Sequence, residues 1–184
     1  MLKFAILIPT LDERKNYLAV LFQHLQRQIE DRNVEIILNA TGKELSIGKK
    51  REQMLMQTNA DYIAFVDDDD MVSHDYIKRI YEAIQSEPDV VGMEGLITTD
   101  RMNPQTWSIS TKYDWGENKD GFKYVRYPNH LAPIKRVHAL EAGFPDKKFG
   151  EDYDYSMRLK ANGKLSKEVY VAQNLYQYHY RTKK

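Results

Sequence analysis

The amino-acid sequence predicts an α/β protein, in which a mostly parallel central sheet is flanked by helices and followed by an α+β second half. Two observations predict this class. Short apolar runs alternate with amphipathic segments over roughly the first hundred residues, which is typical of β-α-β units. The 184 residues contain no Pro/Ser-rich linker, low-complexity run or internal repeat. We therefore expect a single domain over residues 1–184, with halves at 1–100 and 101–184.

The first half is predicted to alternate strands with helices. Its strands are short apolar runs, and the helix that begins near Glu13 carries its apolar side chains on one face. Repeated β-α units of this kind give a parallel sheet with helices on both faces. The face of that helix holds Tyr17, Leu18, Leu21, Leu25 and Ile29. The expected strands are residues 4–8, 34–38, 62–66 and 90–97, and the expected helices are residues 13–29, 48–58 and 75–85.

The second half has a different character. Two strand-like segments surround a loop with the sequence DWGENKDG, and two helical segments end at Gly143 and at Asn162-Gly163. Two further short strands are expected close to residue 180. The expected strands are residues 106–113, 122–127, 169–172 and 175–180, and the expected helices are residues 133–142 and 151–161.

Composition narrows the function classes. Lys+Arg and Asp+Glu both number 27, so the net charge is zero, whereas general nucleic-acid or membrane-surface binders are usually basic. The absence of Cys excludes disulfides, thiolate metal sites and a Cys nucleophile. The apolar run from Phe4 to Ile8 is interrupted by Pro9 and is too short for a signal peptide or a membrane span. We expect a cytoplasmic protein.

Four consecutive aspartates, Asp67 to Asp70, follow the strand-like segment Tyr62–Val66. Two like charges about 4 Å apart repel by roughly 4 kcal/mol at an effective dielectric constant near 20, so the cluster must be stabilised by water, protonation, cations or a metal ion. A solvated acidic turn before the next helix is one interpretation. The position at the carboxyl end of a strand favours the other, because open α/β sheets bind ligands there.

Three longer segments resemble the family 2 glycosyltransferases of the GT-A fold. They are ILIPTLDERKNY, GKKREQMLMQTNADYIAFVDDDD and FPDKKFGEDYDYSMRLKANG. The resemblance implies a single Rossmann-like GT-A domain with a nucleotide-sugar-binding half at 1–100 and an acceptor-binding and catalytic half at 101–184. It also implies inverting, metal-dependent transfer of a sugar from a nucleotide sugar to a hydroxyl group.

The resemblance assigns the aspartates to a DxD motif, which has two possible registers here. Asp67-x-Asp69 is favoured, with Asp67 near the ribose and Asp69 on Mn²⁺ or Mg²⁺. Asp68 and Asp70 are then supporting residues that orient their neighbours. These cations prefer oxygen ligands and neutralise charge on a leaving diphosphate. His179 lies where some family members supply a histidine to the metal, although it could equally be a surface histidine. Arg181, Lys183 and Lys184 could close over the diphosphate or remain solvated.

The donor nucleotide is predicted to contact the first half. Many family members carry an aspartate after the second strand that binds uracil, whereas this sequence has Asn39 near that place. A uridine nucleotide is therefore the default, with the base left open by this departure. Glu13 also fits an acidic residue at a helix N-terminus. The predicted donor-binding residues are Pro9, Thr10, Glu13, Asn39, Gly48, Arg51, Asp67 and Asp68.

The resemblance makes Asp152 the general base that deprotonates the acceptor hydroxyl, with Glu151 supporting it or contacting the acceptor. Without the resemblance, both would be ordinary acids of a first helical turn. Asn129, His130 and Trp115 are predicted to bind the acceptor, and Trp107 is expected in the core. A soluble saccharide or protein is the favoured acceptor. Alternatives are a hydroxylated DNA base, as modified by transferases of bacterial viruses, a nucleotidyltransferase, or a non-catalytic relic of the same fold.

Overall fold

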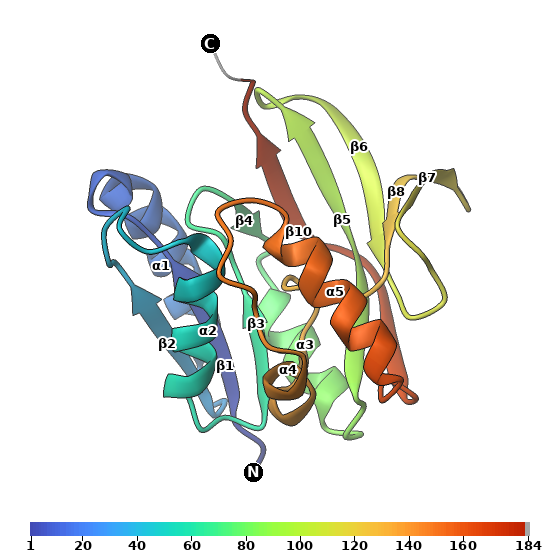
Figure 1. Ribbon diagram of the computed structural model, residues 1–184. Helices are drawn as coiled ribbons and strands as arrows, with labels where there is room; N and C mark the ends of the chain where they lie inside the picture. The colour runs from blue at the N-terminus through green and yellow to red at the C-terminus, as the bar shows by residue number, and fades with distance from the viewer. Residues whose placement is uncertain (183–184) are drawn as a thin grey trace.

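The computed structural model describes residues 1–182, within which the strands form one ten-stranded mixed sheet. The strand order is β2-β1-β3-β9-β5-β6-β8-β7, and β10 pairs with β5 and β4 beside this path. Figure 1 shows the sheet running through the molecule, with α2, α4 and α5 in front and α1 and α3 behind. The predicted α/β class with helices on both faces is confirmed.

The parallel core of the sheet is the part that the sequence predicts best. β1 (Phe4–Pro9) lies between β2 (Val34–Asn39) and β3 (Tyr62–Phe65), and both pairings are parallel. Every residue of β1 is buried, as its unbroken apolar sequence requires. The three strands end at the same edge, so the segments that follow β1 and β3 lie side by side.

The helices of the first half form close to their predicted positions. α1 (Lys15–Ile29) follows a short 3₁₀ turn (Asp12–Arg14), and α2 (Ile47–Gln57) and α3 (Tyr76–Ile84) follow β2 and β4. Leu21 and Leu25 are buried against the sheet. Tyr17, which was predicted on the same face, is 41% exposed, and the guanidinium of Arg181 lies over its ring at 4.4 Å.

The second half differs from the prediction in its strand boundaries. β5 (Val90–Thr99) pairs with β6 (Met102–Ile109), which begins and ends about four residues earlier than expected because its first half continues the hairpin beyond the core. The two short strands expected near the C-terminus are one strand, β10 (Glu168–Tyr180). Register shifts between Val171 and Tyr176 interrupt its apolar alternation, which made the segment resemble two strands. β7 (Gly116–Lys119) and β8 (Phe122–Arg126) form the hairpin at the edge.

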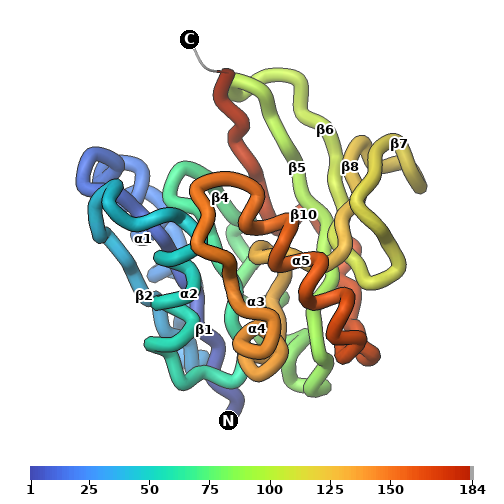
Figure 2. The backbone as a smooth tube through the Cα atoms, in the orientation of Figure 1, coloured from blue at the N-terminus to red at the C-terminus, as the bar shows by residue number. Residues whose placement is uncertain are grey.

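Two very short strands place the second half against the first. The helix expected at 133–142 begins only at Arg136 as α4 (Arg136–Ala142), because β9 (Ile134–Lys135) is inserted antiparallel between β3 and β5. β4 (Met71–Val72) pairs with β10 directly after the aspartates. α5 (Glu151–Asn162) begins where predicted. In Figures 1 and 2, β10 runs beside β5 toward the C-terminus, next to the hairpin of β5 and β6.

None of the helices in residues 1–182 is long and apolar enough to cross a membrane. The core is a single cluster that spans both halves of the chain, from Phe4 and Leu7 in β1 to Leu175 and Tyr176 in β10. The halves predicted at 1–100 and 101–184 therefore share one hydrophobic core.

Candidate active site

A cleft of about 970 Å³ opens at the carboxyl ends of β1 and β3 and extends over the second half of the chain. Its lining includes Asp67, Asp68 and Asp69 after β3 and Asp152 at the start of α5. Its far part is lined by Trp115, Arg126 and other residues of β6 to β8. The two groups of acids that the sequence singled out therefore face one shared space.

The four aspartates alternate between two environments. The side chains of Asp67 and Asp69 are 25% and 20% exposed at the cleft. Asp68 and Asp70 are each 2% exposed. A turn, in which the N–H of Asp70 donates to the carbonyl of Asp67 at 3.1 Å, sets this alternation. The register Asp67-x-Asp69 is therefore the one whose two carboxylates are both partly exposed at the cleft.

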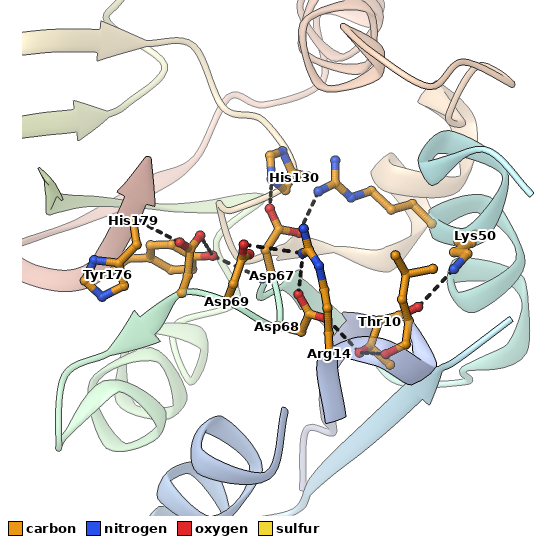
Figure 3. A network of polar contacts seen from close by, with 12 residues as sticks. Thr10, Arg14, Lys50, Asp67, Asp68, Asp69, His130, Tyr176 and His179 are labelled. Atoms are coloured by element: carbon orange, nitrogen blue, oxygen red, sulfur yellow. Dashed lines mark hydrogen bonds and ion pairs between the residues drawn. The ribbon is translucent and has the colours of Figure 1, made fainter. Parts of the chain in front are cut away.

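Asp68 joins the aspartate turn to the segment after β1 (Figure 3). The hydroxyl of Thr10 donates to its Oδ2 at 2.6 Å, and Nη1 of Arg14 donates to its Oδ1 at 2.8 Å. The same Arg14 nitrogen lies 3.4 Å from Asp69. Asp68 thus contributes to the predicted donor site by holding Thr10 and Arg14, and its own oxygens are already occupied.

Asp70 joins the turn to β10, so the supporting role predicted for it involves partners that the sequence did not indicate. The hydroxyl of Tyr176 donates to Oδ2 of Asp70 at 2.8 Å and accepts from the N–H of Asp67 at 3.1 Å. The N–H of His179 donates to Oδ1 of Asp70 at 2.7 Å. Burial, together with the charge of Asp67, raises the pKa of Asp70 well above its ordinary value. Asp70 therefore brings His179 to the cleft.

The metal-binding prediction rests on Asp69 and His179, which both line the cleft. Burial raises the pKa of Asp69, and burial with the charges of Arg101 and Arg181 lowers the pKa of His179. Nδ1 of His179 lies 2.9 Å from the hydroxyl of Thr98. In residues 1–182, no group of three or more His, Asp and Glu side chains forms a ready metal site.

Arg51 connects the two groups of acids. Its guanidinium is 3% exposed and donates from Nη1 to Glu151 at 2.5 Å and from Nη2 to Asp67 at 2.7 Å. Although burial acts to raise the pKa of Asp67, Arg51 and His130 hold it below its ordinary value. Arg51 was predicted to contact the nucleotide sugar. In the structure, its two Nη groups instead link Asp67, after β3, to Glu151 at the start of α5.

Asp152 is the acid of α5 that remains open to a substrate. Glu151 is buried against Arg51, whereas no side-chain hydrogen bond or ion pair engages the carboxylate of Asp152 within residues 1–182. Gly150 precedes the helix with φ of 74°, a left-handed conformation that glycine adopts without strain, and it turns the chain into the cleft. The assignment of Asp152 as the base and Glu151 as its support stays a prediction, and this geometry agrees with it.

The remaining donor residues divide into two groups. Pro9, Thr10 and Arg51 line the cleft, whereas Glu13, Asn39 and Gly48 lie outside its lining. Their contact with a donor stays a prediction. Each of the second group has a partner in the chain. Glu13 pairs with Lys43, Asn39 accepts from the hydroxyl of Thr41 at 2.6 Å, and a Cβ on Gly48 would lie 1.9 Å from the carbonyl oxygen of Pro145.

A buried lysine near the donor end was not predicted. Lys50 is 3% exposed, lines the cleft, and donates from Nζ to the carbonyl of Thr10 at 2.9 Å and to that of Thr41. Burial lowers its pKa. Its position next to Arg51 in the GKKR segment was the available signal, but sequence spacing could not show that Lys50 points inward, because the segment also fits a solvated basic helix face.

The predicted acceptor residues lie at different depths of the cleft. Trp115 is at the far part, where its Nε1 donates to Ser156 at 2.9 Å. Asn129 and His130 are buried beside the aspartates, and Nε2 of His130 lies 3.6 Å from Asp67. Trp107 is buried, as expected. Arg181 also lines the cleft, while Lys183 and Lys184 lie outside the described residues.

Solved structures of similar fold include residues 1–349 of S. aureus TarS, at a TM-score of 0.69 and 18% sequence identity over 96% of this chain. The same TarS fragment in complex with UDP-GlcNAc matches at a TM-score of 0.69 and 16% identity over 99% of this chain. Its complex with UDP matches at a TM-score of 0.69 and 16% identity over 96%. The chain spans 60% of the length of these TarS fragments. At this identity, the likeness establishes a shared fold.

A search of curated protein sequences gave no match. The model of glycosyl transferase family 2 matches residues 40–139, which is more than half of the chain. This segment runs from the end of β2 through the aspartates to α4. The chain therefore belongs to glycosyl transferase family 2 and has the GT-A fold.

Proposed function

We propose that this protein is an inverting, metal-dependent glycosyltransferase that moves a sugar from a UDP-sugar to a hydroxyl group of a small or polymeric acceptor. The observation that carries the proposal is the shared cleft, where Asp67 and Asp69 face Asp152 across one space. A single displacement needs the donor phosphates and the base on opposite sides of the reacting carbon. The cleft has Asp67 and Asp69 for the side of the donor phosphates and Asp152 for the side of the base.

The donor end suits a nucleoside diphosphate. Arg14 and Lys50 supply positive charge beside the aspartate turn, and the segment after β1 is fixed by Asp68. S. aureus TarS, which shares the fold, has been solved with UDP-GlcNAc and with UDP, which supports a uridine donor for this chain.

Asp69 and His179 would hold the divalent cation, with the remaining positions filled by diphosphate oxygens and water. Mg²⁺ sites of transferases often use one or two carboxylates with substrate phosphates, so two protein ligands are sufficient. The raised pKa of Asp69 is consistent with a carboxylate that a bound cation would stabilise in its charged form. When bound, the metal supplies charge neutralisation at the leaving diphosphate.

The chain's own groups supply the rest of the reaction. Asp152 accepts the proton of the acceptor hydroxyl as that oxygen attacks the sugar carbon from the face opposite the diphosphate. Arg51 holds Glu151 and Asp67 in place, so that the base helix and the donor site keep a fixed relative position. Arg14 stabilises the negative charge of the aspartate turn and lies next to Asp69.

The experiment that tests the proposal is a screen for release of free nucleoside diphosphate. The wild-type protein is incubated with UDP-, GDP- and ADP-sugars with MnCl₂ or EDTA, without acceptor and with saccharide acceptors. We expect release from a UDP-sugar that EDTA abolishes, and a rise in melting temperature with UDP and Mn²⁺. Absence of release from all donors, with no thermal shift by any diphosphate, would contradict the proposal.

A further inference from the structure

The part of the cleft farthest from the aspartates is built around Arg126, which follows Val125 at the end of β8. Its guanidinium carbon lies 4.6 Å from the ring centre of Trp115 and 5.2 Å from that of Tyr124. Nη1 donates to the carbonyls of Gly116 at 2.8 Å and Val125 at 2.9 Å. The two rings and two carbonyls hold the guanidinium in one orientation.

One edge of this guanidinium has no partner. Within residues 1–182, Nε and Nη2 of Arg126 make no hydrogen bond, and neither atom is enclosed in the protein. Arg126 lines the cleft, so this edge is accessible from it. Nε and Nη2 are the parallel pair of donors that binds both oxygens of a carboxylate or phosphate.

Arg126 differs in this respect from the arginines at the donor end. Arg14 contacts Asp68 and Asp69, and Arg51 contacts Asp67 and Glu151. No carboxylate among residues 1–182 forms an ion pair with Arg126, although the side chain is half-buried and burial lowers its pKa. A partly desolvated cation without an anion is unfavourable unless a ligand supplies the missing charge.

The position of Arg126 relates it to the acceptor. Arg126 and the candidate base Asp152 both line the cleft. Burial lowers the pKa of Arg126, and the negative charges of Glu117 and Asp152 partly offset this effect. Trp115 connects this part of the cleft to α5 through Ser156, four residues after the candidate base. An acceptor whose hydroxyl reaches Asp152 would place its neighbouring groups over Trp115 and against Arg126.

We propose that the acceptor is anionic, with a carboxylate or phosphate close to the hydroxyl that receives the sugar, and that Nε and Nη2 of Arg126 bind this group. The inference rests on the proposed transferase function and specifies the substrate class of its acceptor site. Arg126 then determines specificity, because a neutral acceptor would leave its charge without a partner.

Trp115 provides a direct readout that needs no turnover. The chain has two tryptophans, so Trp107→Phe leaves Trp115 as the single indole, directly over Arg126. This protein, saturated with UDP and Mn²⁺ to occupy the donor end, is titrated with glucuronic acid, glucose 6-phosphate and glucose while its fluorescence is recorded. We expect a saturable change with at least one of the anionic sugars and none with glucose. The anion that responds identifies the acceptor's charged group.

Arg126→Met in the same background should weaken the anion response by about tenfold or more, which is the loss expected when a charge-assisted pair is removed. Arg126→Lys keeps the charge without the fork and should fall between the two, and it replaces the Met variant if that variant fails to fold. Arg79→Met on α3 is the control variant. It removes the same charge from an arginine that lies outside the cleft lining and pairs with Asp75, so it should leave the titration unchanged.

The outcomes separate this inference from the proposed function. An absent anion response, an equal response to glucose, or an equal response in Arg126→Met would overturn the assignment of an anionic acceptor. Release of UDP by the wild-type protein, measured without acceptor, tests the transferase function alone and does not depend on these titrations.

Discussion

The two ends of the cleft use charge in opposite ways. At the donor end, Arg14 and Arg51 are paired with carboxylates before any ligand arrives. At the acceptor end, Arg126 and Asp152 have no ion-pair partner among residues 1–182. In the proposed function, a diphosphate and its cation would bring charges that an organised network can receive without rearrangement, whereas the open groups at the other end would be left for the acceptor to engage. The difference suggests a preformed donor site and an acceptor site that substrate completes.

The largest expected effect is the loss of transfer when Asp152, the carboxylate without an ion-pair partner among residues 1–182, is changed. Asp152→Asn keeps the shape and removes the base, so we expect transfer to fall by about 10² to 10⁴-fold, as for other general bases, while UDP still raises the melting temperature. Initial rates with saturating donor measure the change. Asp154→Asn, in the same helical turn and paired with Lys147, is the matched control and should keep transfer near the wild-type rate. Normal transfer by Asp152→Asn would show that the open acid is not the base.

Substitutions of Arg51 test whether the donor end of the cleft is stabilised by the ion pairs of Arg51 with Asp67 and Glu151. Arg51→Met leaves the buried Glu151 and the partly exposed Asp67 without their cation, which should lower the free energy of unfolding by about 3–5 kcal/mol. Arg51→Lys keeps the charge but loses one of the two bonds, so it should lie between Met and wild type. Urea unfolding measures both variants. Equal stability of the Met variant and the wild type would indicate that water compensates these acids and that the network is not preformed.

The sequence predicts those parts of the site that depend on local patterns, and it does not predict the contacts between residues that are far apart in the chain. The strand that precedes Asp67 and the helix that follows Gly150 are local patterns, and both form as expected, so the two acid groups could be placed. The pairing of Arg51 with Glu151 joins residues 100 positions apart and left no local signal. The same holds for Asp70, whose partners Tyr176 and His179 lie on a bulged strand that the pattern split in two.

Arg126 shows why the acceptor end is harder to read. Its sequence neighbourhood, FKYVRYPN, indicates an ordinary amphipathic strand with a basic residue at its end. Its role becomes visible only when the rings of Trp115 and Tyr124 are placed around the guanidinium and its free edge is found. A residue whose importance lies in a missing partner has no sequence pattern of its own.

Asp89, a paired carboxylate outside the cleft lining, can be changed to test stability without changing the site. Asp89 accepts hydrogen bonds from the N–H of Lys167 at 2.9 Å and from Ser166, and it pairs with Lys135 and His138. Burial acts to raise the pKa of Asp89, but these hydrogen bonds hold that pKa below its ordinary value. We expect Asp89→Asn to cost about 1.5–3 kcal/mol in unfolding free energy near neutral pH without lowering the transfer rate measured well below the melting temperature.

The pH dependence of that cost follows from the sign of the shift. Because the folded pKa lies below the unfolded value, the stabilisation by Asp89 is present above about pH 4 and is lost as pH falls through the folded pKa. The stability difference between wild type and Asp89→Asn should therefore shrink in acid. Asp31→Asn, at an exposed turn, should show no such difference. A constant gap down to pH 2 would mean that the charge of Asp89 is not what stabilises this edge.

The smallest expected effect is at the contact that holds the end of β10 to the donor site. Tyr176→Phe removes the hydroxyl shared by Asp70 and the N–H of Asp67 and should lower the unfolding free energy by about 1 kcal/mol. Because Asp70 also holds the N–H of His179, the change should raise the Mn²⁺ concentration needed for half-maximal transfer. Tyr180→Phe, on the same strand but half exposed, is the control that should alter neither. A Tyr176→Phe variant that loses stability but keeps its Mn²⁺ requirement would show that His179 reaches the cleft without Asp70, and the donor end would then be less tightly preorganised than its hydrogen bonds suggest.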